Sequence, residues 1–302
     1  MSTELVQYIK KRQDELDAII LAHFYQLPEI QDIADIVGDS LQLAREASKT
    51  SASVIVSCGV RFMAETAKIL NPDKKVLLPA VEAGCAMADM VTAEALREKK
   101  RQYPQAVVVS YVNTSAEVKA ESDICCTSAN AIEVIKSIPE DRPILFVPDR
   151  NLGKWIEAQT NREMFFWAGC CPVHDQVTIE QVREQQRLYP DAPLVVHPEC
   201  PPEITSAADA VRSTSGMLKY IQESSARDFI VGTEEGFLYT LENNTSGKRF
   251  HLARTDFICQ DMKYITLERL AKSMKEEKDL VEIPEEIRER AYQALDRMLQ
   301  IG

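Results

Sequence analysis

The sequence predicts an α/β fold made of three tandem Rossmann-like units that are related by pseudo-threefold symmetry. The first observation behind this prediction is that short apolar runs alternate with helical patterns along the whole chain, which is typical of parallel α/β structure. The second is that three local features recur at a nearly constant spacing, which indicates repeated structural units. The strand-like runs include residues 18–22, 53–57, 76–78, 107–109, 144–147 and 194–196.

The first recurring feature is a strand that ends in polar residues. Its copies lie 88 and 87 residues apart, at Ala22, Ser110 and His197. The second feature is a helix that opens with a hydroxyl residue. Its copies are again 88 and 87 residues apart, at Ser40, Ser128 and Ser215. The third feature is a strand that runs into a cysteine, with steps of 86 and 88 residues, at Cys85, Cys171 and Cys259.

This period divides the chain into three expected domains. They cover residues 1–88, 89–175 and 176–264, and a chain of 302 residues is long enough for three such units. The remaining segment, residues 265–302, is charged and helical. We expect this segment to pack back on the first unit.

Composition and charge exclude several classes of protein. The formal net charge of −12 disfavours a nucleic-acid partner, which basic side chains would have to hold through its phosphates. No window approaches about eighteen consecutive apolar residues, so no membrane-spanning helix is expected. Residues 1–13 lack the apolar core of a secretory signal. We therefore expect a cytoplasmic protein whose eight cysteines are reduced or bind metal rather than form disulfides.

The three cysteines of the repeat predict a metal site. Equivalent positions around a pseudo-threefold axis point toward that axis, so Cys85, Cys171 and Cys259 would converge there. Thiolates bind zinc, copper(I) or iron-sulfur clusters, and zinc is disfavoured because the chain has no C-x-x-C pair. On a four-iron cluster, three thiolates leave one iron open to a substrate oxygen. Cys170 fits the spacing as well as Cys171, which we prefer because a Pro-Val-His sequence follows it.

The hydroxyl residues of the second feature predict an anion-binding site. Ser40, Ser128 and residues 213–215 occupy positions where helix N-caps belong. Helix N-termini bind anions through free N–H groups and the helix dipole. Three caps directed at one axis would suit a substrate with several carboxylates or a phosphate. No nucleotide-binding glycine motif occurs, so the α/β pattern does not predict a nucleotide cofactor.

Several titratable residues at strand ends or beside a predicted cysteine ligand form a plausible acid/base set. Histidine titrates near neutral pH, and tyrosine or glutamate can be tuned toward it. The set consists of His23, Tyr25, His174, His197 and Glu199. Four other basic residues are expected to lie outside the site: Arg61, Arg150, Lys263 and His251.

The chain resembles the quinolinate synthase A family, whose members make the pyridine ring of NAD, over nearly its whole length. The resemblance rests on seven short segments. They are residues 22–26 (AHFYQ), 38–40 (GDS), 110–113 (SYVN), 126–130 (CTSAN), 169–174 (GCCPVH), 197–200 (HPEC) and 259–263 (CQDMK).

This resemblance implies a 4Fe-4S cluster on Cys85, Cys171 and Cys259, and condensation of iminosuccinate with dihydroxyacetone phosphate to quinolinate, phosphate and water. An aspartate oxidase or dehydrogenase would supply the imine. The open iron would act as a Lewis acid while His23, Tyr25, His197 and Glu199 carry protons. The implied substrate-binding residues are His23, Ser40, Tyr111, Val112 through its backbone, Asn113, Ser128, His197, Pro198, Glu199 and Thr214.

Two other functions are compatible with the same cysteines. An iron-sulfur reductase of the three-domain isoprenoid type also mounts a cluster on three cysteines, and redox turnover of that cluster would distinguish it. A structural or metal-sensing protein would use the cysteines only to hold iron or zinc. The polar strand ends and the shortage of basic residues for binding DNA argue against this second alternative.

Overall fold

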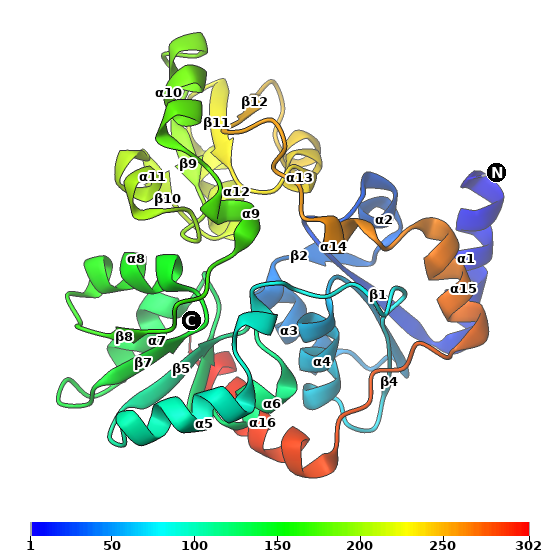
Figure 1. The fold of residues 1–302 in the computed structure, drawn as a ribbon. Helices are drawn as coiled ribbons and strands as arrows, with labels where there is room; N and C mark the ends of the chain where they lie inside the picture. The colour runs from blue at the N-terminus through cyan, green and yellow to red at the C-terminus, as the bar shows by residue number, and fades with distance from the viewer. Residues whose placement is uncertain (1, 302) are drawn as a thin grey trace.

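The computed structural model describes residues 2–301, and within them the chain forms three four-stranded sheets, one in each part of the repeat (Figure 1). The strand order is the same in each sheet: β2-β1-β3-β4, β6-β5-β7-β8 and β10-β9-β11-β12. Neighbouring strands run parallel in all three. This shared order confirms the predicted fold of three Rossmann-like units.

The strands are short, as is usual in parallel sheets. In the first unit they are β1 (Ala18–His23), β2 (Ile36–Gly38), β3 (Val54–Cys58) and β4 (Lys75–Leu77). In the second unit they are β5 (Val107–Tyr111), β6 (Ile124–Cys126), β7 (Ile144–Val147) and β8 (Phe165–Phe166). In the third unit they are β9 (Leu194–Val196), β10 (Ala210–Val211), β11 (Asp228–Gly232) and β12 (Arg249–Leu252). β3 and β7 are buried along their whole length, because parallel sheets are covered on both faces.

Helices connect and cover these strands. The first unit contains α1 (Ser2–Leu16), α2 (Pro28–Ile33), α3 (Ser40–Lys49) and α4 (Arg61–Leu70). A 3-10 helix, η1 (Ala88–Met90), leads to α5 (Ala93–Gln102), α6 (Ala116–Ala120), α7 (Ala131–Ser137) and α8 (Arg150–Thr160). Then come α9 (Pro172–Asp175), α10 (Ile179–Leu188), α11 (Pro202–Ala207), α12 (Thr214–Glu223), α13 (Gly236–Asn244) and α14 (Gln260–Lys263). The chain closes with α15 (Leu267–Glu276) and α16 (Glu285–Leu299).

Polar residues cap two of the helices that begin near the carboxyl ends of the strands. Asp39 accepts the N–H of Gln42 at the start of α3, and Ser213 accepts the N–H of Gly216 at the start of α12. Ser40 was expected to be a cap, but it is the first residue inside α3. The carboxylate of Asp39 is the stronger acceptor for a free helix amide, so it takes the cap position.

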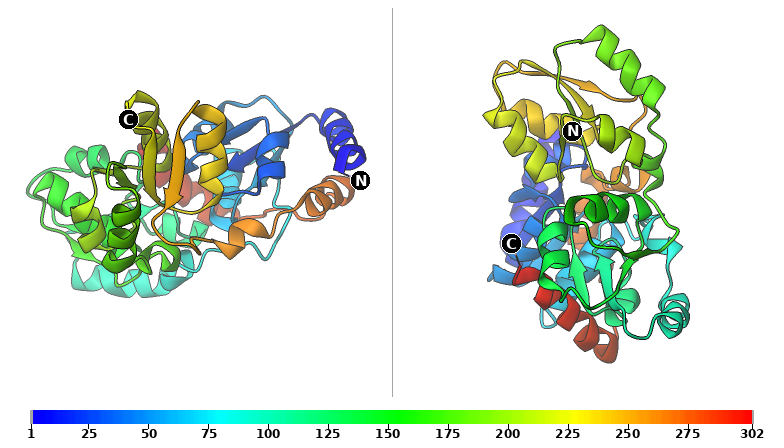
Figure 2. Two further views of the ribbon diagram at one scale, coloured as in Figure 1. Left: turned by 90° about the horizontal axis from the view of Figure 1, so that it is seen from above. Right: turned by 90° about the vertical axis from the view of Figure 1, so that its left-hand side faces the viewer.

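The C-terminal segment contacts both the first and the second units. α15 lies beside α1, as the left-hand view in Figure 2 shows. The stretch before α16 pairs with the edge of the first sheet, where Leu78 N–H donates to Asp279 and Val281 N–H donates to Val76. α16 then packs against α6, β6 and α4. Boundaries after residues 88, 175 and 264 put one sheet in each unit, and we keep them as our proposal for the domains.

Candidate active site

One cavity is lined by residues that follow strands of all three sheets. His23 and Tyr111 are the last residues of β1 and β5, and His197 directly follows β9. These three strands occupy the same position in their sheets, so their carboxyl ends deliver equivalent positions to one place. The predicted site residues that line the cavity are His23, Tyr25, Ser40, Cys85, Tyr111, Asn113, Ser128, Cys171, His174, His197, Glu199, Thr214 and Cys259.

Val112 and Pro198 are the two predicted binding residues that are not among those lining the cavity. Both backbone groups of Val112 are engaged within the protein. Its N–H donates to Cys126 over 2.8 Å, and its carbonyl accepts the N–H of Thr114 over 2.8 Å. A ligand could therefore use only the second lone pair of the Val112 carbonyl. The roles of Val112 and Pro198 stay predictions.

His23 and His197 share one local arrangement that keeps both rings neutral. In each case the ring Nδ1 accepts a backbone N–H from two residues further on, at 3.2 Å from Tyr25 and at 3.3 Å from Glu199. Burial lowers the pKa of His23 to about 3 and that of His197 to about 4. With Nδ1 as the acceptor, Nε2 carries the proton, and Nε2 of His197 lies 3.1 Å from Ser128 Oγ. Both rings can donate a hydrogen bond into the cavity.

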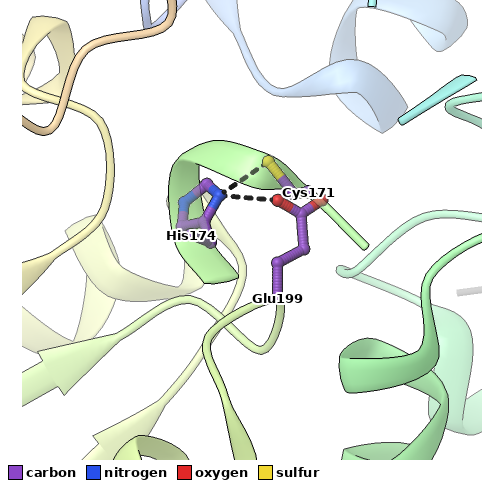
Figure 3. Close-up of side chains that lie close together, drawn as sticks. All are labelled: Cys171, His174 and Glu199. Carbon is purple, nitrogen blue, oxygen red and sulfur yellow. Dashed lines mark hydrogen bonds and ion pairs between the residues drawn. The ribbon is translucent and has the colours of Figure 1, made fainter. Parts of the chain in front are cut away.

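A chain of hydrogen bonds runs from Tyr25 to Glu199. Tyr25 Oη lies 2.6 Å from Thr233 Oγ1, which lies 2.9 Å from His174 Nε2. His174 Nδ1 lies 2.8 Å from Glu199 Oε2 and 3.2 Å from Cys171 Sγ (Figure 3). Because an ionised carboxylate only accepts, Nδ1 of His174 is the protonated nitrogen, and Nε2 can accept from Thr233. Thr233 was not predicted, because it follows β11, the third strand of its unit, whereas the repeated polar ends belong to the first strand of each unit.

The two ends of this chain have opposite protonation states. Burial raises the pKa of Tyr25 well above its usual value, so its phenol is protonated at neutral pH. Burial alone would also raise the pKa of Glu199, but the neighbouring His197 and His174, and hydrogen bonds from His174 and Tyr111, lower it instead. The site therefore holds a resting acid and a resting base, joined by hydrogen bonds.

The three predicted cysteine ligands are free thiols that line the same cavity. Each sulfur accepts a backbone N–H from three residues further on: Ala88 for Cys85, His174 for Cys171 and Met262 for Cys259. Such N–H groups favour a thiolate. Burial nevertheless raises the pKa of Cys85 to about 12 and that of Cys259 to about 11. Three partly buried sulfurs with this donor chemistry fit a bound cationic metal centre, which would offset the cost of the thiolate charge.

A smaller group could also hold a metal ion. One ligand atom each from Cys171, His174 and Glu199 lie within 4.8 Å of one another. Hydrogen bonds of His174 Nδ1 to the other two side chains account for this proximity, as Figure 3 shows. Cys171 is therefore a possible metal ligand both in this group and in the group of three cysteines.

The cavity offers neutral groups that can bind anions, although four carboxyl side chains also line it: Asp39, Glu199, Glu234 and Asp261. Among residues 2–301, no lysine or arginine lines it. Its lining includes Ser40 and Thr214 at the first turns of α3 and α12, whose free N–H groups attract negative charge. Asn113 adds an amide NH₂ group that can donate to an anion, and its buried oxygen, which has no partner in the protein, can accept from a substrate hydroxyl. A carboxylate or phosphate would be held here by neutral donors and helix dipoles.

Two further buried carboxylates lie behind the cysteines, and the sequence analysis did not identify them. Asp149 accepts the N–H of Cys171, and Glu234 accepts the N–H of Cys259. Lys263, which was expected outside the site, does not line the cavity but pairs with Glu234 at 2.8 Å. Glu234 is itself part of the cavity wall, whereas Asp149 and Lys263 support the wall without lining it.

A three-unit α/β fold that brings an acid, a base and possible metal ligands to one cavity defines an enzyme. Comparison with known proteins identifies its family. Residues 7–300 match the family described as Quinolinate synthetase A protein. The quinolinate synthase of Desulforudis audaxviator (strain MP104C) is 53% identical, with 100% of this chain and 99% of that protein covered. That of Geotalea uraniireducens (strain Rf4) is 51% identical, with 99% and 98% covered.

A more distant relative extends the same similarity to an archaeon. The quinolinate synthase of Methanosarcina barkeri (strain Fusaro / DSM 804) is 47% identical, with 99% of this chain and 98% of that protein covered. The chain belongs to the quinolinate synthase family, which confirms the resemblance seen in its motifs. Within residues 2–301, no helix is both long and apolar enough to cross a membrane.

Proposed function

We propose that this protein is a quinolinate synthase that condenses iminosuccinate with dihydroxyacetone phosphate to quinolinate, releasing phosphate and water. Family membership supports the reaction, and one structural observation carries the assignment to this cavity. The observation is that three cysteines from separate parts of the repeat line the same cavity as the chain from Tyr25 to Glu199. A substrate bound in this cavity would therefore meet both the three sulfur donors and the acid and base of the hydrogen-bonded chain.

The three thiols are proposed to hold a 4Fe-4S cluster. Cys85, Cys171 and Cys259 leave one iron of such a cluster without a protein ligand, and that iron would supply Lewis acidity toward a substrate hydroxyl. The N–H groups directed at the three sulfurs would stabilise their negative charge. Two observations support a cluster at this site: the three donors are sulfur atoms, and all three line one cavity.

Substrate anions are proposed to bind at the helix N-termini. The first turns of α3 and α12 offer N–H groups near Ser40 and Thr214. Asn113, Tyr111 and Ser128 add neutral polar groups on the wall that belongs to the second unit. Neutral His23 and His197 can donate from Nε2 without adding a counter-charge that would hold the product tightly. The roles of Val112 and Pro198 in substrate binding belong to the same proposal.

Proton transfer is proposed to use the two ends of the hydrogen-bonded chain. Glu199 is ionised at rest and can take a proton from a substrate carbon, while Tyr25 is protonated and can give one to a leaving oxygen. Thr233 and His174 join the two groups, and a proton gained by Glu199 can return to Tyr25 once the Thr233 hydroxyl has rotated and His174 has moved its own proton from Nδ1 to Nε2. Removal of a carbon proton and loss of a hydroxyl as water are thereby balanced within the site.

The substrate chemistry also implies a supplier. Iminosuccinate is an imine that water hydrolyses, so an enzyme that oxidises the amine of aspartate, by oxidase or dehydrogenase chemistry, must produce it as it is consumed. Both substrates are small intracellular metabolites, and we propose the cytoplasm as the site of action. No step in this scheme requires a nucleic acid or a membrane.

The test is to purify the protein without oxygen, measure iron, sulfide and the electronic spectrum, and then assay for quinolinate from the two substrates. We expect about four irons per chain, as for a 4Fe-4S cluster, and quinolinate formation. Bound zinc without product would instead support the structural or metal-sensing alternative. A four-iron cluster without product, which changes oxidation state during turnover, would support a reductase.

A further inference from the structure

Two buried carboxylates hold the backbone of two of the proposed cluster ligands. Asp149 Oδ2 lies 3.0 Å from the amide nitrogen of Cys171, and Glu234 Oε1 lies 3.1 Å from that of Cys259. Both side chains are fully buried. Each lies two residues after the third strand of its unit, β7 or β11, so the two positions are equivalent in the repeat. The same device therefore fixes a cysteine loop in the second and the third units.

The two carboxylates differ in their other partners. The second oxygen of Asp149 accepts the N–H groups of Asn151 and Leu152 and caps α8. Glu234 instead binds the ammonium of Lys263, with 2.8 Å between Oε1 and Nζ. The side chain of Lys263 is only 15% exposed, so this ion pair is shielded from solvent. Glu234 therefore holds both ends of α14, since Cys259 precedes this helix and Lys263 ends it.

Lys263 extends the connection to the first unit. Its Nζ donates to the carbonyl oxygen of Tyr25 over 2.7 Å. The phenol of the same Tyr25 reaches Thr233, the residue before Glu234. The backbone and the side chain of Tyr25 are thus both held by the segment that follows β11. Its position depends on contacts across 208 residues of sequence.

Gly236 shows how closely these groups are packed. Its N–H donates to Glu234 Oε2 over 2.7 Å. A Cβ at this position would lie 2.8 Å from both Lys263 Nζ and the Tyr25 carbonyl oxygen, and 2.9 Å from Glu234 Oε2. Real Cβ atoms do not come this close, so the contact between Lys263 and Tyr25 requires glycine here.

We propose that Glu234 and Lys263 are a positioning pair that couples the ligand loop of Cys259 to the backbone of Tyr25. The pair would direct the phenol of Tyr25 into the cavity only when α14 is in place, and α14 is fixed by Cys259. The inference rests on the proposed function, since it takes Cys259 as a ligand and Tyr25 as the acid. Partners that orient metal ligands are typically worth roughly 10- to 100-fold in affinity or activity.

The first test is the variant Lys263→Met, compared with the wild-type protein as purified without oxygen. We expect unchanged iron, sulfide and electronic spectrum, because Glu234 still accepts the N–H of Cys259. We expect kcat to fall roughly 10- to 100-fold with little change in KM, because the acid is misdirected while the anion-binding groups are intact. Wild-type kcat, or loss of iron in proportion to the loss of kcat, would overturn the proposal.

Amide hydrogen exchange supplies a readout that does not depend on turnover. In Lys263→Met, and equally in Gly236→Ala, exchange should accelerate in residues 24–26 and not in β7. The matched control is Asp149→Asn, the equivalent carboxylate without a lysine, which should leave exchange in residues 24–26 unchanged. Faster exchange throughout the chain in Lys263→Met would show a merely structural role, and unchanged exchange in residues 24–26 would remove the coupling.

A double variant tests whether the two residues act as a pair. Glu234→Gln keeps an oxygen to accept the N–H of Cys259, and combined with Lys263→Met it leaves no buried charge unpaired. If the residues act through each other, the double variant should lose no more kcat than the single variants, and additive losses would contradict the pair. A wild-type protein without iron would contradict the proposed function instead, while the exchange measurement would still report on the pair.

Discussion

The phenol oxygen of Tyr25, which follows β1, lies 2.6 Å from the hydroxyl oxygen of Thr233, which follows β11. Thr233 is completely buried, and its hydroxyl also lies 2.9 Å from His174 Nε2. A single hydroxyl of the third unit thus joins an acid from the first unit to a histidine at the end of the second. Both contacts of the Thr233 hydroxyl are with side chains, so this hydroxyl does not cap a neighbouring backbone group. Its place in the chain from Tyr25 to Glu199 explains why a polar side chain is buried here.

Replacing Thr233 with valine should interrupt this chain without changing the volume of the side chain greatly. We expect kcat to fall by roughly 100-fold or more, as when a proton-transfer group is lost. Iron content should be unchanged, because Thr233 contacts none of the three sulfurs. Thr233→Ser restores the hydroxyl and should recover most of the activity. Equal activity in the valine and serine variants would show that the hydroxyl has no part in proton transfer.

Tyr25→Phe examines the other end of the same contact. The variant removes the proton that the raised pKa of Tyr25 keeps in place at neutral pH, and we expect turnover to fall by roughly 100-fold or more. The cluster should remain, since Tyr25 is not a proposed ligand. Steady-state kinetics with a parallel iron assay measure both effects. Near-normal kcat with a full complement of iron would remove Tyr25 from the mechanism.

The adjacent thiols Cys170 and Cys171 offer a matched pair of substitutions. Cys171 lines the cavity and contacts His174, whereas Cys170 points to Asp175, at 3.4 Å, and does not line the cavity. Cys171→Ala should therefore abolish the absorbance of the cluster and the formation of quinolinate. Cys170→Ala should keep about four irons per chain and near-normal activity. The opposite pattern would move the ligand assignment by one residue.

The repeat could be predicted from the sequence because three separate features recur in every unit at nearly the same spacing. Strands such as 144–147 and 194–196 appear in the structure with the predicted bounds, since buried parallel strands are short apolar runs. Edge strands such as β10 (Ala210–Val211) have only two residues and carry no usable periodicity. Short strands at the edges of these sheets become recognisable only when the neighbouring strand is known.

The candidate site was predictable where its residues repeat and not where they depend on distant contacts. The three cysteines and the polar ends of β1, β5 and β9 follow the period, and the structure brings them to one cavity. Thr233 and Glu234 follow β11, but their importance comes from Tyr25 and Lys263. Lys263 looks like a solvent-exposed lysine in the sequence, and only the buried carboxylate opposite it shows otherwise.

The two neutral histidines predict how stability depends on pH. Histidines of the unfolded chain bind protons as the pH falls through about 6.5, whereas folded His23 and His197 stay neutral until about pH 3 and 4. The unfolded state therefore binds more protons, and the free energy of unfolding rises with pH in this range. Between pH 7 and 5, each histidine should contribute a slope approaching about 1.4 kcal/mol per pH unit.

Chemical denaturation at pH 7, 6 and 5 measures this slope. The comparison with a variant isolates His23, because Asp149, whose pKa burial raises to about 8 and which gives a slope of opposite sign, is present in both proteins. His23→Gln removes one titrating group. The slope of the free energy of unfolding against pH should therefore fall by the contribution of one histidine, which approaches about 1.4 kcal/mol per pH unit. A slope that is the same in both proteins would mean that folded His23 takes up its proton as readily as an unfolded histidine.

A buried lysine braces the loop that carries Asn113. The side chain of Lys119 is fully buried, and its Nζ donates to the carbonyl oxygen of Thr114. Glu65 of the first unit accepts the N–H of Ala116 over 3.0 Å and lies near enough for its charge to interact with Lys119. The loop is therefore held from both sides by charged groups that solvent does not reach.

Lys119→Met should leave the Thr114 carbonyl without its donor, and Glu65 with Arg61, 4.0 Å away, as its remaining cation. We expect a loss of about 1–3 kcal/mol in the free energy of unfolding, as for a buried carbonyl left without its hydrogen-bond donor. We also expect a higher KM, because Asn113 is then held less firmly against the substrate. The exposed Lys136 is the control, and Lys136→Met should change neither quantity.

Adding Glu65→Gln to the Lys119→Met variant separates the charge from the packing. The second substitution removes the buried charge of Glu65, whose remaining cation is Arg61, while its amide oxygen can still accept the N–H of Ala116. Part of the lost free energy of unfolding should therefore return, because an uncompensated buried charge costs more than a neutral polar group in the same place. A double variant that is less stable than Lys119→Met alone would show that the two residues contribute independently, by packing rather than by their opposite charges.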